Sequence, residues 1–442
     1  MPPAPPTSDN PGRSTARETG LTHQHQPKRV LFATIGSLGD LHPCLALGLE
    51  LQRRGHAVTV ATTPYYRQIV ETQGIAFHPI RPDWNPTDRD MISQCDNLKR
   101  GPEILFRRFI LPHLRDTYLD LIQAATSADL MVAGELNYAA PLVAEKLRLP
   151  WVSAILSPAS FFSALDPCYM VNVPWLAHVR KAGPFAYRAV MCAGRFGSRH
   201  WWNPVRKLRE EQGLNAACDP LFRDKFSPHL VLALFSSLLA PQQPDWPSQT
   251  QQPGFVFFDR QPTSQTPDPA LAAFLSLPDP PIVFTQGSTA VHAPGDFYPV
   301  SAQAARQLGR RALLLGTDTV PGGPSQDICA LPYAPYSQVF PRATVNVHQG
   351  GSGTIGQALH AGRPQLIVPF GWDQPDNALR VERLGGGIHL PRSQYSVNTA
   401  IKALEQLLRD DRFAVSAALA GTKIQAETSL ASACDALELL LR

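Results

Sequence analysis

A glycine-rich run in the second half of the chain holds the residue types best suited to chemistry: His348-Gln349-Gly350-Gly351-Ser352-Gly353-Thr354. Mostly apolar residues at 343–347 predict a buried strand before this run, and residues 355–361 predict a helix after it. At such a turn, backbone N–H groups and the positive end of the helix attract an anion, and glycine lets the backbone approach it. We therefore predict a site for a diphosphate that carries a sugar. The alternative is a tight turn that binds nothing.

A second polar cluster, Gly371-Trp372-Asp373-Gln374-Pro375, lies about twenty residues further along the chain. It also follows an apolar run, at 366–369. In a parallel α/β sheet, both clusters would lie at the carboxyl ends of neighbouring strands, which is where ligands bind. This shared position favours a functional site over an isolated turn.

Asp40 is the residue best placed to act as a general base. Residues 29–34 predict a strand and residues 43–54 a helix, so Asp40 lies in the loop between them. Its carboxylate would point into a cleft, and the N-terminal end of the helix would keep it ionised. Two alternatives stay open. Asp40 is the N-cap of the helix that begins near His42, or His42 is itself the base.

Length and composition limit the class of protein. The 442 residues, 44% of them hydrophobic, suit two domains of roughly 200 residues, each with its own core. The net charge of +4 is small and does not imply nucleic acid as a partner. We expect neither a secretory signal nor a membrane span, because long apolar runs are absent from the sequence. Seven dispersed cysteines predict reduced thiols in a cytoplasm, with no disulfide framework and no zinc site.

Short apolar segments alternate with helical segments in both halves of the chain. The predicted strands are residues 29–34, 56–61, 129–133 and 150–155, followed by 282–285, 312–315, 344–347 and 365–368. A long helical stretch is predicted over about 103–125. Alternation of strands and helices in both halves predicts an α/β protein with two parallel sheets; the resemblance described next implies that they form two Rossmann-like domains that face each other across a cleft.

Three stretches resemble the family-1 nucleotide-sugar glycosyltransferases. The run from Tyr333-Ala334-Pro335 to Asp373-Gln374 resembles their donor-binding signature, in particular that of the bacterial branch that glycosylates lipids and natural products. Gly36-Ser37-Leu38-Gly39-Asp40-Leu41-His42-Pro43 also resembles the family. Phe284-Thr285-Gln286-Gly287-Ser288-Thr289, with Gly295-Asp296-Phe297-Tyr298 after it, is most similar to the rhamnosyltransferases of rhamnolipid synthesis. The resemblance implies the GT-B architecture, with the active site between the two domains.

The same resemblance implies roles for individual residues. Asp40 takes the position of the catalytic base, and Asp373 with Gln374 that of the pair that holds sugar hydroxyls. The implied donor-binding residues are Gly287, Ser288, Ala334, Pro335, His348, Gln349, Gly350, Gly351, Ser352, Gly353, Thr354, Gln357, Asp373 and Gln374. Many bacterial relatives have two consecutive histidines at His348-Gln349, so it stays open which side chain faces the phosphates. Gln357 replaces a ribose-binding glutamate of plant relatives, which leaves the choice between UDP and dTDP open.

Composition and the implied fold together divide the chain into five parts. Residues 1–27 are polar and rich in proline and predict a disordered tail, and residues 243–267 predict a linker. The acceptor-binding domain would span 28–242 and the nucleotide-sugar-binding domain 268–424. Residues 425–442 would form a helix that returns to the first domain.

An insertion at 161–209 breaks the α/β pattern of the first domain with aromatic and basic residues. Eight Lys/Arg and no Asp or Glu lie between His178 and Arg209. One interpretation is a solvated basic face with aromatic side chains packed beneath it. The other is an apolar acceptor pocket, formed by His42, Phe161, Trp201 and Trp202, whose basic rim suits an anionic lipid or a membrane surface.

Together these features predict an inverting glycosyltransferase. It would move a hexose from UDP-glucose or dTDP-rhamnose to a hydroxyl of a lipophilic acceptor, such as a hydroxy fatty acid lipid, a sterol-like lipid or a natural product. No Asp-x-Asp motif precedes the predicted sugar site, so we expect no metal and no cofactor. We expect a cytoplasmic protein in peripheral contact with the inner membrane face, and the oligomeric state stays open.

Two alternatives belong to other functional classes. One is a sugar-nucleotide 2-epimerase on the same fold, and the other is a non-catalytic nucleotide-sugar binding protein. The epimerase needs no acceptor pocket, and a non-catalytic protein has no need of Asp40. A nicotinamide dehydrogenase is disfavoured, because Gly36-x-x-Gly39 lacks the third glycine of that fingerprint.

Overall fold

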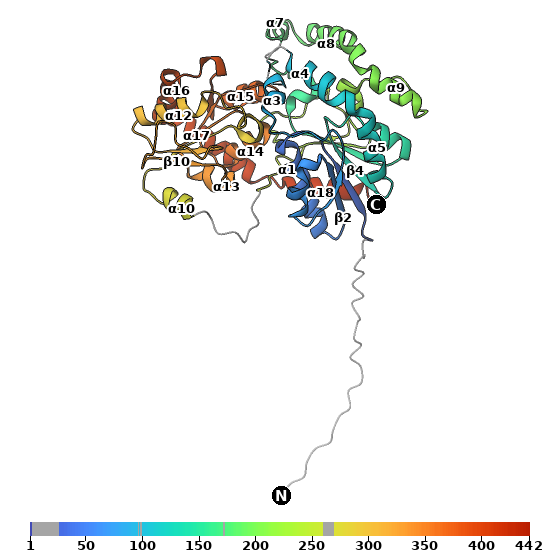
Figure 1. Cartoon of the computed structure of the whole chain (residues 1–442), viewed down its shortest axis with the longest axis horizontal. Helices are drawn as coiled ribbons and strands as arrows, with labels where there is room; N and C mark the ends of the chain where they lie inside the picture. The colour runs from blue at the N-terminus through green and yellow to red at the C-terminus, as the bar shows by residue number, and fades with distance from the viewer. Residues whose placement is uncertain (2–25, 96, 98–99, 171–172, 260–268) are drawn as a thin grey trace.

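The chain folds into two α/β units joined by one crossing segment and by the last helix (Figure 1). The computed structural model describes residues 1, 26–95, 97, 100–170, 173–259 and 269–442. Most of the predicted disordered tail therefore lies outside the described residues. The two units and their parallel sheets confirm the predicted GT-B architecture.

The first sheet has seven parallel strands in the order β3-β2-β1-β4-β5-β6-β7. Their bounds are β1 Arg29–Ala33, β2 Ala57–Thr62, β3 Ala76–Pro79, β4 Leu130–Gly134, β5 Trp151–Ile155, β6 Leu230–Ala233 and β7 Thr250–Gln251. The central strands β5 and β6 are buried along their whole length because helices cover both faces of the sheet. The order reverses between β1 and β4, and this is the position where ligands bind in such sheets.

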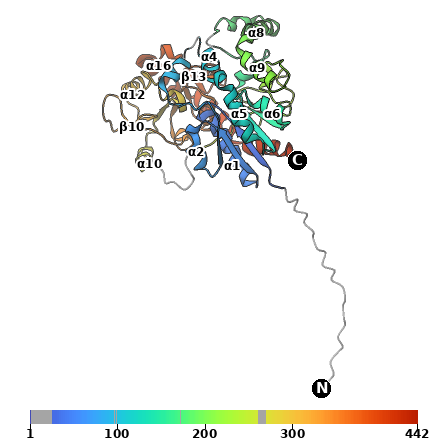
Figure 2. The ribbon, with the colours of Figure 1, turned by 45° about the vertical axis from the view of Figure 1, so that its right-hand side comes forward.

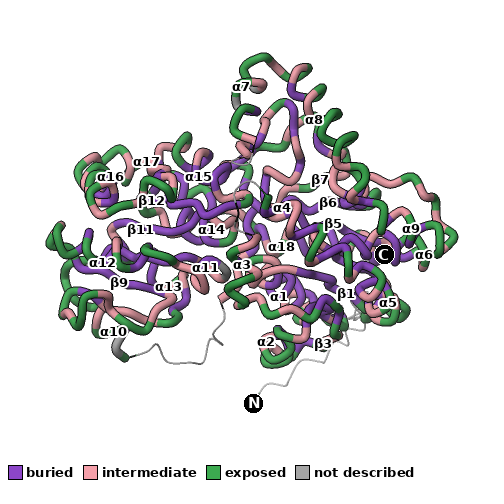
Figure 3. Tube along the Cα trace, turned by 45° about the horizontal axis from the view of Figure 1, so that its top comes forward, coloured by how far each residue is buried: buried purple, intermediate pink, exposed green. Residues whose placement is uncertain are grey.

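The second sheet has six parallel strands in the order β10-β9-β8-β11-β12-β13. Their bounds are β8 Ile282–Thr285, β9 Ala312–Leu315, β10 Ile328–Leu331, β11 Val345–His348, β12 Gln365–Ile367 and β13 Gly387–His389. Here the order reverses between β8 and β11, so the loops after these two strands face the same crevice. Figure 3 shows the buried residues concentrated along the strands of both sheets.

Helices cover both sheets (Figure 2). In the first half they are α1 Leu38–Arg53, α2 Arg67–Glu71, α3 Arg89–Cys95, α4 Gly101–Ile104, α5 Leu114–Ala125, α6 Ala140–Leu147, α7 Leu176–Lys181, α8 Pro184–Ser198 and α9 Asn203–Glu211. In the second half they are α10 Pro269–Leu275, α11 Gly287–Ala290, α12 Phe297–Gln307, α13 Tyr336–Val339, α14 Ser352–His360, α15 Gln374–Arg383, α16 Val397–Arg409, α17 Asp411–Gln425 and α18 Ser429–Leu439. Shorter 3₁₀ and π segments are η1 Pro64–Tyr66, η2 Leu105–Ile110, η3 Leu111–His113, η4 Pro158–Phe161, η5 Arg199–Trp202, η6 Pro220–Asp224, η7 Phe340–Arg342 and η8 Arg392–Gln394.

The helical stretch predicted over 103–125 is confirmed, although its helix type changes along the chain. It consists of α4, the π segment η2, the 3₁₀ turn η3 and then α5. Pro112 lies in η3, where a proline has no N–H to donate and its ring crowds the preceding turn. The change of helix type therefore occurs at this proline.

Two segments connect the units. Within the predicted linker 243–267, β7 pairs in parallel with β6, so the first sheet extends past residue 242. Phe255 and Val256 are buried further along, and residues 260–267 lie outside the described part. The last helix, α18, packs against α1 of the first unit through Ala433, Cys434 and Leu437.

Candidate active site

The carboxyl edges of the two sheets face each other and bring the predicted site residues together. Asp40 follows β1 in the first unit, and the runs at 348–354 and 371–375 follow β11 and β12 in the second. Two hydrogen bonds cross between the units at this level. The Ser352 hydroxyl donates to the carbonyl of Leu156, and the Ser157 hydroxyl bonds the Asp373 carboxylate. The base loop and the donor loops therefore lie in one cleft.

Asp40 takes part in a capping box, although the N-cap of α1 is Ser37. Its Oδ2 accepts from the Ser37 backbone N–H at 2.7 Å and from the Ser37 hydroxyl at 3.1 Å. A Cβ on Gly36, whose φ is +139°, would lie 2.3 Å from the same oxygen, so only glycine fits before this turn. Within the described part of the chain, Oδ1 accepts no hydrogen bond. One carboxylate oxygen therefore positions the loop and the other is available to a substrate.

Burial raises the pKa of Asp40 to about 6, although the residue keeps some exposed surface, and the carboxylates of Glu135 and Asp373 raise it further. The Ser37 N–H opposes this shift. A carboxylate with a pKa near 6 is mostly ionised at neutral pH and is more basic than an ordinary aspartate. The N-cap alternative is wrong, because α1 begins at Leu38 with Ser37 as its N-cap. Asp40 instead completes the capping box through Oδ2, which leaves Oδ1 available to take a proton.

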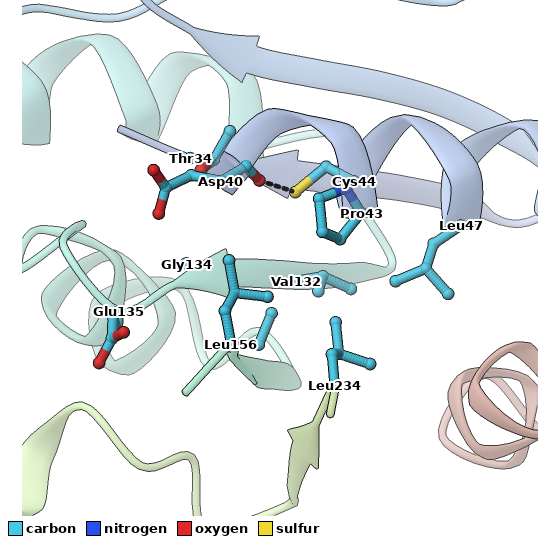
Figure 4. Close-up of a pocket in the computed structure, with 11 residues that line it drawn as sticks. Thr34, Asp40, Pro43, Cys44, Leu47, Val132, Gly134, Glu135, Leu156 and Leu234 are labelled. Carbon is cyan, nitrogen blue, oxygen red and sulfur yellow. Dashed lines mark hydrogen bonds between the residues drawn. The ribbon is translucent and has the colours of Figure 1, made fainter. Parts of the chain in front are cut away.

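Glu135 is a site residue that the sequence analysis missed. It directly follows β4, the neighbour of β1, and lines the same small cavity as Asp40 (Figure 4). The Lys225 ammonium lies 3.3 Å from its Oε2, and burial lowers the pKa of this lysine. The signal was present, because a polar residue directly after a predicted central strand is the same pattern that pointed to Asp40.

The cavity between Asp40 and Glu135 has a volume of about 10 Å³, close to the space of one water molecule. Its wall includes Thr34 and Cys44, and Figure 4 shows these side chains around Asp40. The buried Thr34 hydroxyl finds no hydrogen-bond partner among the described residues. A polar group of a ligand or a water would satisfy it.

Both ring nitrogens of His348 are bonded within the second unit. The residue is fully buried, its Nε2 lies 2.9 Å from Gln365 Oε1, and its Nδ1 accepts from the Gly350 N–H at 3.1 Å. Burial lowers the pKa of this imidazole to about 4, so the ring is neutral and donates to Gln365. The donor-binding role implied for His348 stays a prediction, and the contact that the structure shows is with the backbone N–H of Gly350. Its ring stabilises the glycine-rich turn through the hydrogen bond from the Gly350 N–H.

Gln349 is the residue that lies between the two glycine loops. A Cβ on Gly287, whose φ is +65°, would lie 2.0 Å from Gln349 Nε2, and a Cβ on Gly351 would lie 2.9 Å from the same atom. Gln349 Nε2 also donates to the Thr354 hydroxyl at 3.4 Å. Of the two side chains, Gln349 is therefore the one that lies against the Gly287 loop, whereas both ring nitrogens of His348 are bonded within the second unit.

The N-terminus of α14 is open to an anion. Its N-cap is Gly351, which has no side chain to bond the first-turn N–H groups. Beside it, the Thr354 hydroxyl bonds Tyr336, whose hydroxyl lies 3.0 Å from that of Thr285 at the end of β8. The Ser352 hydroxyl is used in the contact with Leu156. Backbone N–H groups, rather than the Ser352 side chain, are therefore available here.

Asp373 and Gln374 form the second polar turn. Asp373 Oδ2 accepts from Asn377 at 2.7 Å, and burial raises the pKa of Asp373 to about 6, with the Glu135 carboxylate adding to the shift. Gln374 Oε1 accepts from the N–H groups of Phe370, at 2.8 Å, and Gly371, at 3.2 Å. The side-chain oxygen of Gln374 therefore stabilises the turn. Its side-chain nitrogen, Nε2, is the atom that remains for the predicted contact with a sugar.

The remaining donor residues line the second unit around these loops. Ala334 is buried after β10, and Pro335 is the N-cap of α13. Gln357 lies on α14 and is 9% exposed. Gly287 and Ser288 begin the short helix α11 directly after β8, opposite Gln349.

Most of the predicted acceptor residues are packed into cores. Phe161 is buried and stacks on Trp246 with 4.0 Å between ring centroids. Trp202 is also buried, with its ring 5.0 Å from that of Tyr138, and Trp201 packs against the same cluster. Phe161 and Trp202 are therefore corrected to core residues, since rings from other segments of the first unit stack on them. The His42 ring packs 5.2 Å from Phe258 on the crossing segment.

An ion cluster, formed by Asp166, Asp376 and Arg380, joins the two units beside Asp373. Arg380 donates to Asp376 Oδ2 at 2.7 Å on its own helix and to Asp166 Oδ2 at 2.5 Å in the first unit. Asp376 Oδ1 accepts the Tyr169 N–H at 2.7 Å. Because α15 begins at Gln374, this cluster holds the second polar turn against the first unit.

Two protein-family models match the chain, one in each of its two units. The glycosyltransferase family 28 N-terminal domain matches residues 30–161, and the C-terminal domain of the erythromycin biosynthesis protein CIII-like family matches residues 318–436. The O-mycaminosyltylonolide 6-deoxyallosyltransferase of Streptomyces fradiae is 30% identical over 93% of this chain and 97% of the relative. The chain is a glycosyltransferase of this natural-product family. The family prediction is confirmed, and the epimerase and non-catalytic alternatives are set aside.

Further similarities extend the comparison. A sterol 3-β-glucosyltransferase of Yarrowia lipolytica is 26% identical over 95% of this chain, which spans only 29% of that enzyme. The solved glycosyltransferase of kitacinnamycin has a TM-score of 0.68 at 20% identity, covering 95% of this chain and 100% of that one. The spinosyn rhamnosyltransferase SpnG, complexed with thymidine diphosphate, has a TM-score of 0.64 at 20% identity, with 93% and 100% coverage. The glycosyltransferase thus shares its fold with these structures. Across its described residues, no helix is long and apolar enough to cross a membrane.

Proposed function

We propose that this glycosyltransferase moves a hexose from a nucleotide diphosphate sugar to a hydroxyl of a lipophilic acceptor, with inversion at the anomeric carbon. The observation that carries the proposal is the placement of Asp40 after β1 of the first unit and of Asp373 after β12 of the second, with the Ser157 hydroxyl of the first unit bonded to the Asp373 carboxylate. A base on one edge of the cleft and a sugar-binding turn on the other is the arrangement that direct displacement requires.

In this mechanism, Asp40 Oδ1 accepts the proton of the acceptor hydroxyl. The acceptor oxygen attacks the anomeric carbon from the face opposite the diphosphate, and the bond from that carbon to the diphosphate oxygen breaks. A single displacement inverts the anomeric configuration. The proton remains on Asp40 and the electron pair leaves with the nucleotide diphosphate, so charge develops on the phosphates as the reaction proceeds.

Groups of the second unit would stabilise that charge. The uncapped N–H groups of α14 and the Gln349 amide lie where the two glycine loops approach each other. We propose that these neutral donors replace a metal ion. Among the described residues, no group of three or more His, Cys, Asp or Glu is arranged to hold one. Activity that survives EDTA supports this part of the proposal, and strict dependence on a divalent ion would refute it.

For the donor, we propose a dTDP-6-deoxyhexose such as dTDP-rhamnose, with UDP-glucose as the alternative. Support comes from the 6-deoxyallosyltransferase relative and from the solved neighbours that contain thymidine diphosphate. For the acceptor, we propose a macrolide-like or sterol-like alcohol, because the relatives are named for a tylonolide and for sterols.

The test is a matrix of dTDP-rhamnose and UDP-glucose against a tylonolide-type macrolide, a sterol, a hydroxy fatty acid dimer and a flavonoid, with products detected by mass. Thermal unfolding with each nucleotide sugar separates donor binding from turnover, since a ligand bound only to the folded chain raises the midpoint. Transfer only to small soluble sugars would overturn the acceptor proposal. The anomeric configuration of any product, read by NMR coupling constants, tests inversion.

A further inference from the structure

The helix α8, which begins at Pro184, stands out from the first unit with one face uncovered (Figures 1 and 3). Phe185 is 84% exposed and Phe196 is 67% exposed, which is unusual for such large apolar side chains. Helical spacing places both on one stripe of the helix, together with Arg188, Ala189, Cys192 and Arg199. We call this stripe the outer face of α8.

The outer face is not needed to fold α8. The opposite side of the helix already packs in a small core, where Tyr187 is fully buried against Ala164 and Leu176, and Val190 and Met191 pack at its edge. An ordinary amphipathic helix has one apolar face. Here a second apolar stripe is left in solvent, so the outer face has the composition of a contact surface without a partner in the chain.

The charge around the outer face is positive. No acidic residue occurs between His178 and Arg209, where eight Lys/Arg do. Arg195 pairs with Asp219, whereas Arg188 has no ion pair with any described residue. The Arg199 guanidinium lies 4.1 Å from the centroid of the Phe196 ring, so this cation lies directly over an exposed aromatic face. Trp175, which is 54% exposed, precedes the helical pair α7–α8.

We propose that the outer face of α8 docks on an anionic lipid bilayer. Phenylalanine rings enter the boundary between head groups and acyl chains, and the arginines beside them meet the lipid phosphates, which is how interfacial helices bind. The shape agrees with this occupant, because α8 projects from the first unit and a projecting helix fits a soft planar surface (Figures 1 and 3). Its charge complements anionic head groups.

Docking there would hold the cleft close to the membrane. Asp166 and Tyr169, which lie upstream of α7 along the chain, contact Arg380 and Asp376 beside the second polar turn. If the proposed function is right, a lipophilic acceptor would then pass from the bilayer to Asp40 over a short path. Vesicle binding itself needs no donor and no turnover, so its failure can be distinguished from failure of the proposed transfer reaction.

The experiment is co-sedimentation of the full-length protein with vesicles of phosphatidylglycerol and phosphatidylcholine, and with vesicles of phosphatidylcholine alone. We expect binding to the anionic vesicles that weakens with salt, and a loss of roughly tenfold or more in Phe185→Ser/Phe196→Ser and in Arg188→Gln/Arg199→Gln. The matched control is Val415→Ser/Leu419→Ser on α17, because these residues are 57% and 61% exposed on the second unit. Circular dichroism confirms that each variant is folded.

Three results would overturn the proposal. The first is equal binding to both kinds of vesicle, and the second is an equal loss of binding in the α17 control. The third is a combination of two observations: the wild type does not bind vesicles, and light scattering detects a dimer that Phe185→Ser/Phe196→Ser abolishes. The outer face of α8 would then bind a second copy of the chain.

Discussion

Arg380 and Asp166 connect the two units of the molecule across 214 positions of the sequence, with 2.5 Å between Nη1 and Oδ2. The arginine side chain is 3% exposed and also pairs with Asp376 on its own helix. Because α15 starts at the sugar-binding turn, this pair sets where Asp373 lies relative to the base loop. The relative position of the two half-sites therefore depends on a buried charge.

Asp166→Asn should loosen this connection. Arg380 would keep its ion pair with Asp376 but lose its ion pair with residue 166. We expect the free energy of unfolding to fall by roughly 1–3 kcal/mol. Hydrogen exchange should quicken at 163–170 and in α15. The control is Arg383→Gln, because this half-exposed side chain lies 4.0 Å from the same carboxylate and should change little. An unchanged exchange rate in Asp166→Asn would show that the contact does not hold the units together.

Asp40→Asn tests the base. Asparagine keeps the shape of the side chain but cannot accept the proton, so turnover should fall by roughly 10²–10⁴ while nucleotide binding is retained. Ser37→Ala is the control, since it removes the capping hydroxyl but keeps the carboxylate and should cost only about 1 kcal/mol of stability. Near wild-type turnover in Asp40→Asn would leave Asp40 as a capping residue only.

The pH profile of kcat/KM should have an acidic limb near pH 6. Protonation inactivates a base, so activity is present above its pKa and is lost as the pH falls through it, and the pKa of Asp40 is about 6. The negative charge of Asp373 contributes to this raised pKa of Asp40, after burial and the charge of Glu135. Asp373→Asn removes one negative charge, so the residual activity should persist to lower pH. If the acidic limb lies at the same pH in Asp373→Asn as in the wild type, the charge of Asp373 does not raise the pKa of Asp40.

His348 should make the second unit sensitive to acid. Its pKa is lowered from 6.5 to about 4 in the folded state, so its contribution to stability is present above pH 6.5 and is lost as the pH falls toward 4. Between pH 7 and pH 5 this amounts to about 2 kcal/mol. His348→Gln should lose that part of the pH dependence in urea unfolding followed at both pH values. His229→Gln, an exposed control, should keep it.

Gly351→Val tests the glycine-rich turn. A β-branched side chain would meet Gln349 Nε2, which lies 2.9 Å from the Cβ position, and would also fill the space in front of the α14 N-terminus. Calorimetry should then detect no binding of UDP or dTDP. Gly194→Val in α8 is the control, because a Cβ there meets nothing within 4 Å. Unchanged affinity in Gly351→Val would make the turn structural.

The two α/β units, the glycine-rich turn after β11 and the position of Asp40 after β1 could all be predicted from the sequence. Each depends on short-range patterns: apolar runs of strand length, glycine where the backbone must turn, and polar residues directly after a strand. The same rule applied to residues 129–135 would have found Glu135. The change of helix type before α5 is also a local effect, because it occurs at Pro112, which can be read in the sequence.

Tertiary structure decided what each side chain of the site is free to do. His348 and Gln349 are adjacent in the chain, yet Gln365 on β12 holds one and leaves the other between the glycine loops. Phe161 and Trp202 became core residues because rings distant in sequence stack on them. Burial raises the pKa of Asp40, and Glu135 and Asp373 raise it further, because long-range strand order and the interdomain contacts bring them close. Desolvation and charge coupling act through space, so no local sequence pattern specifies them.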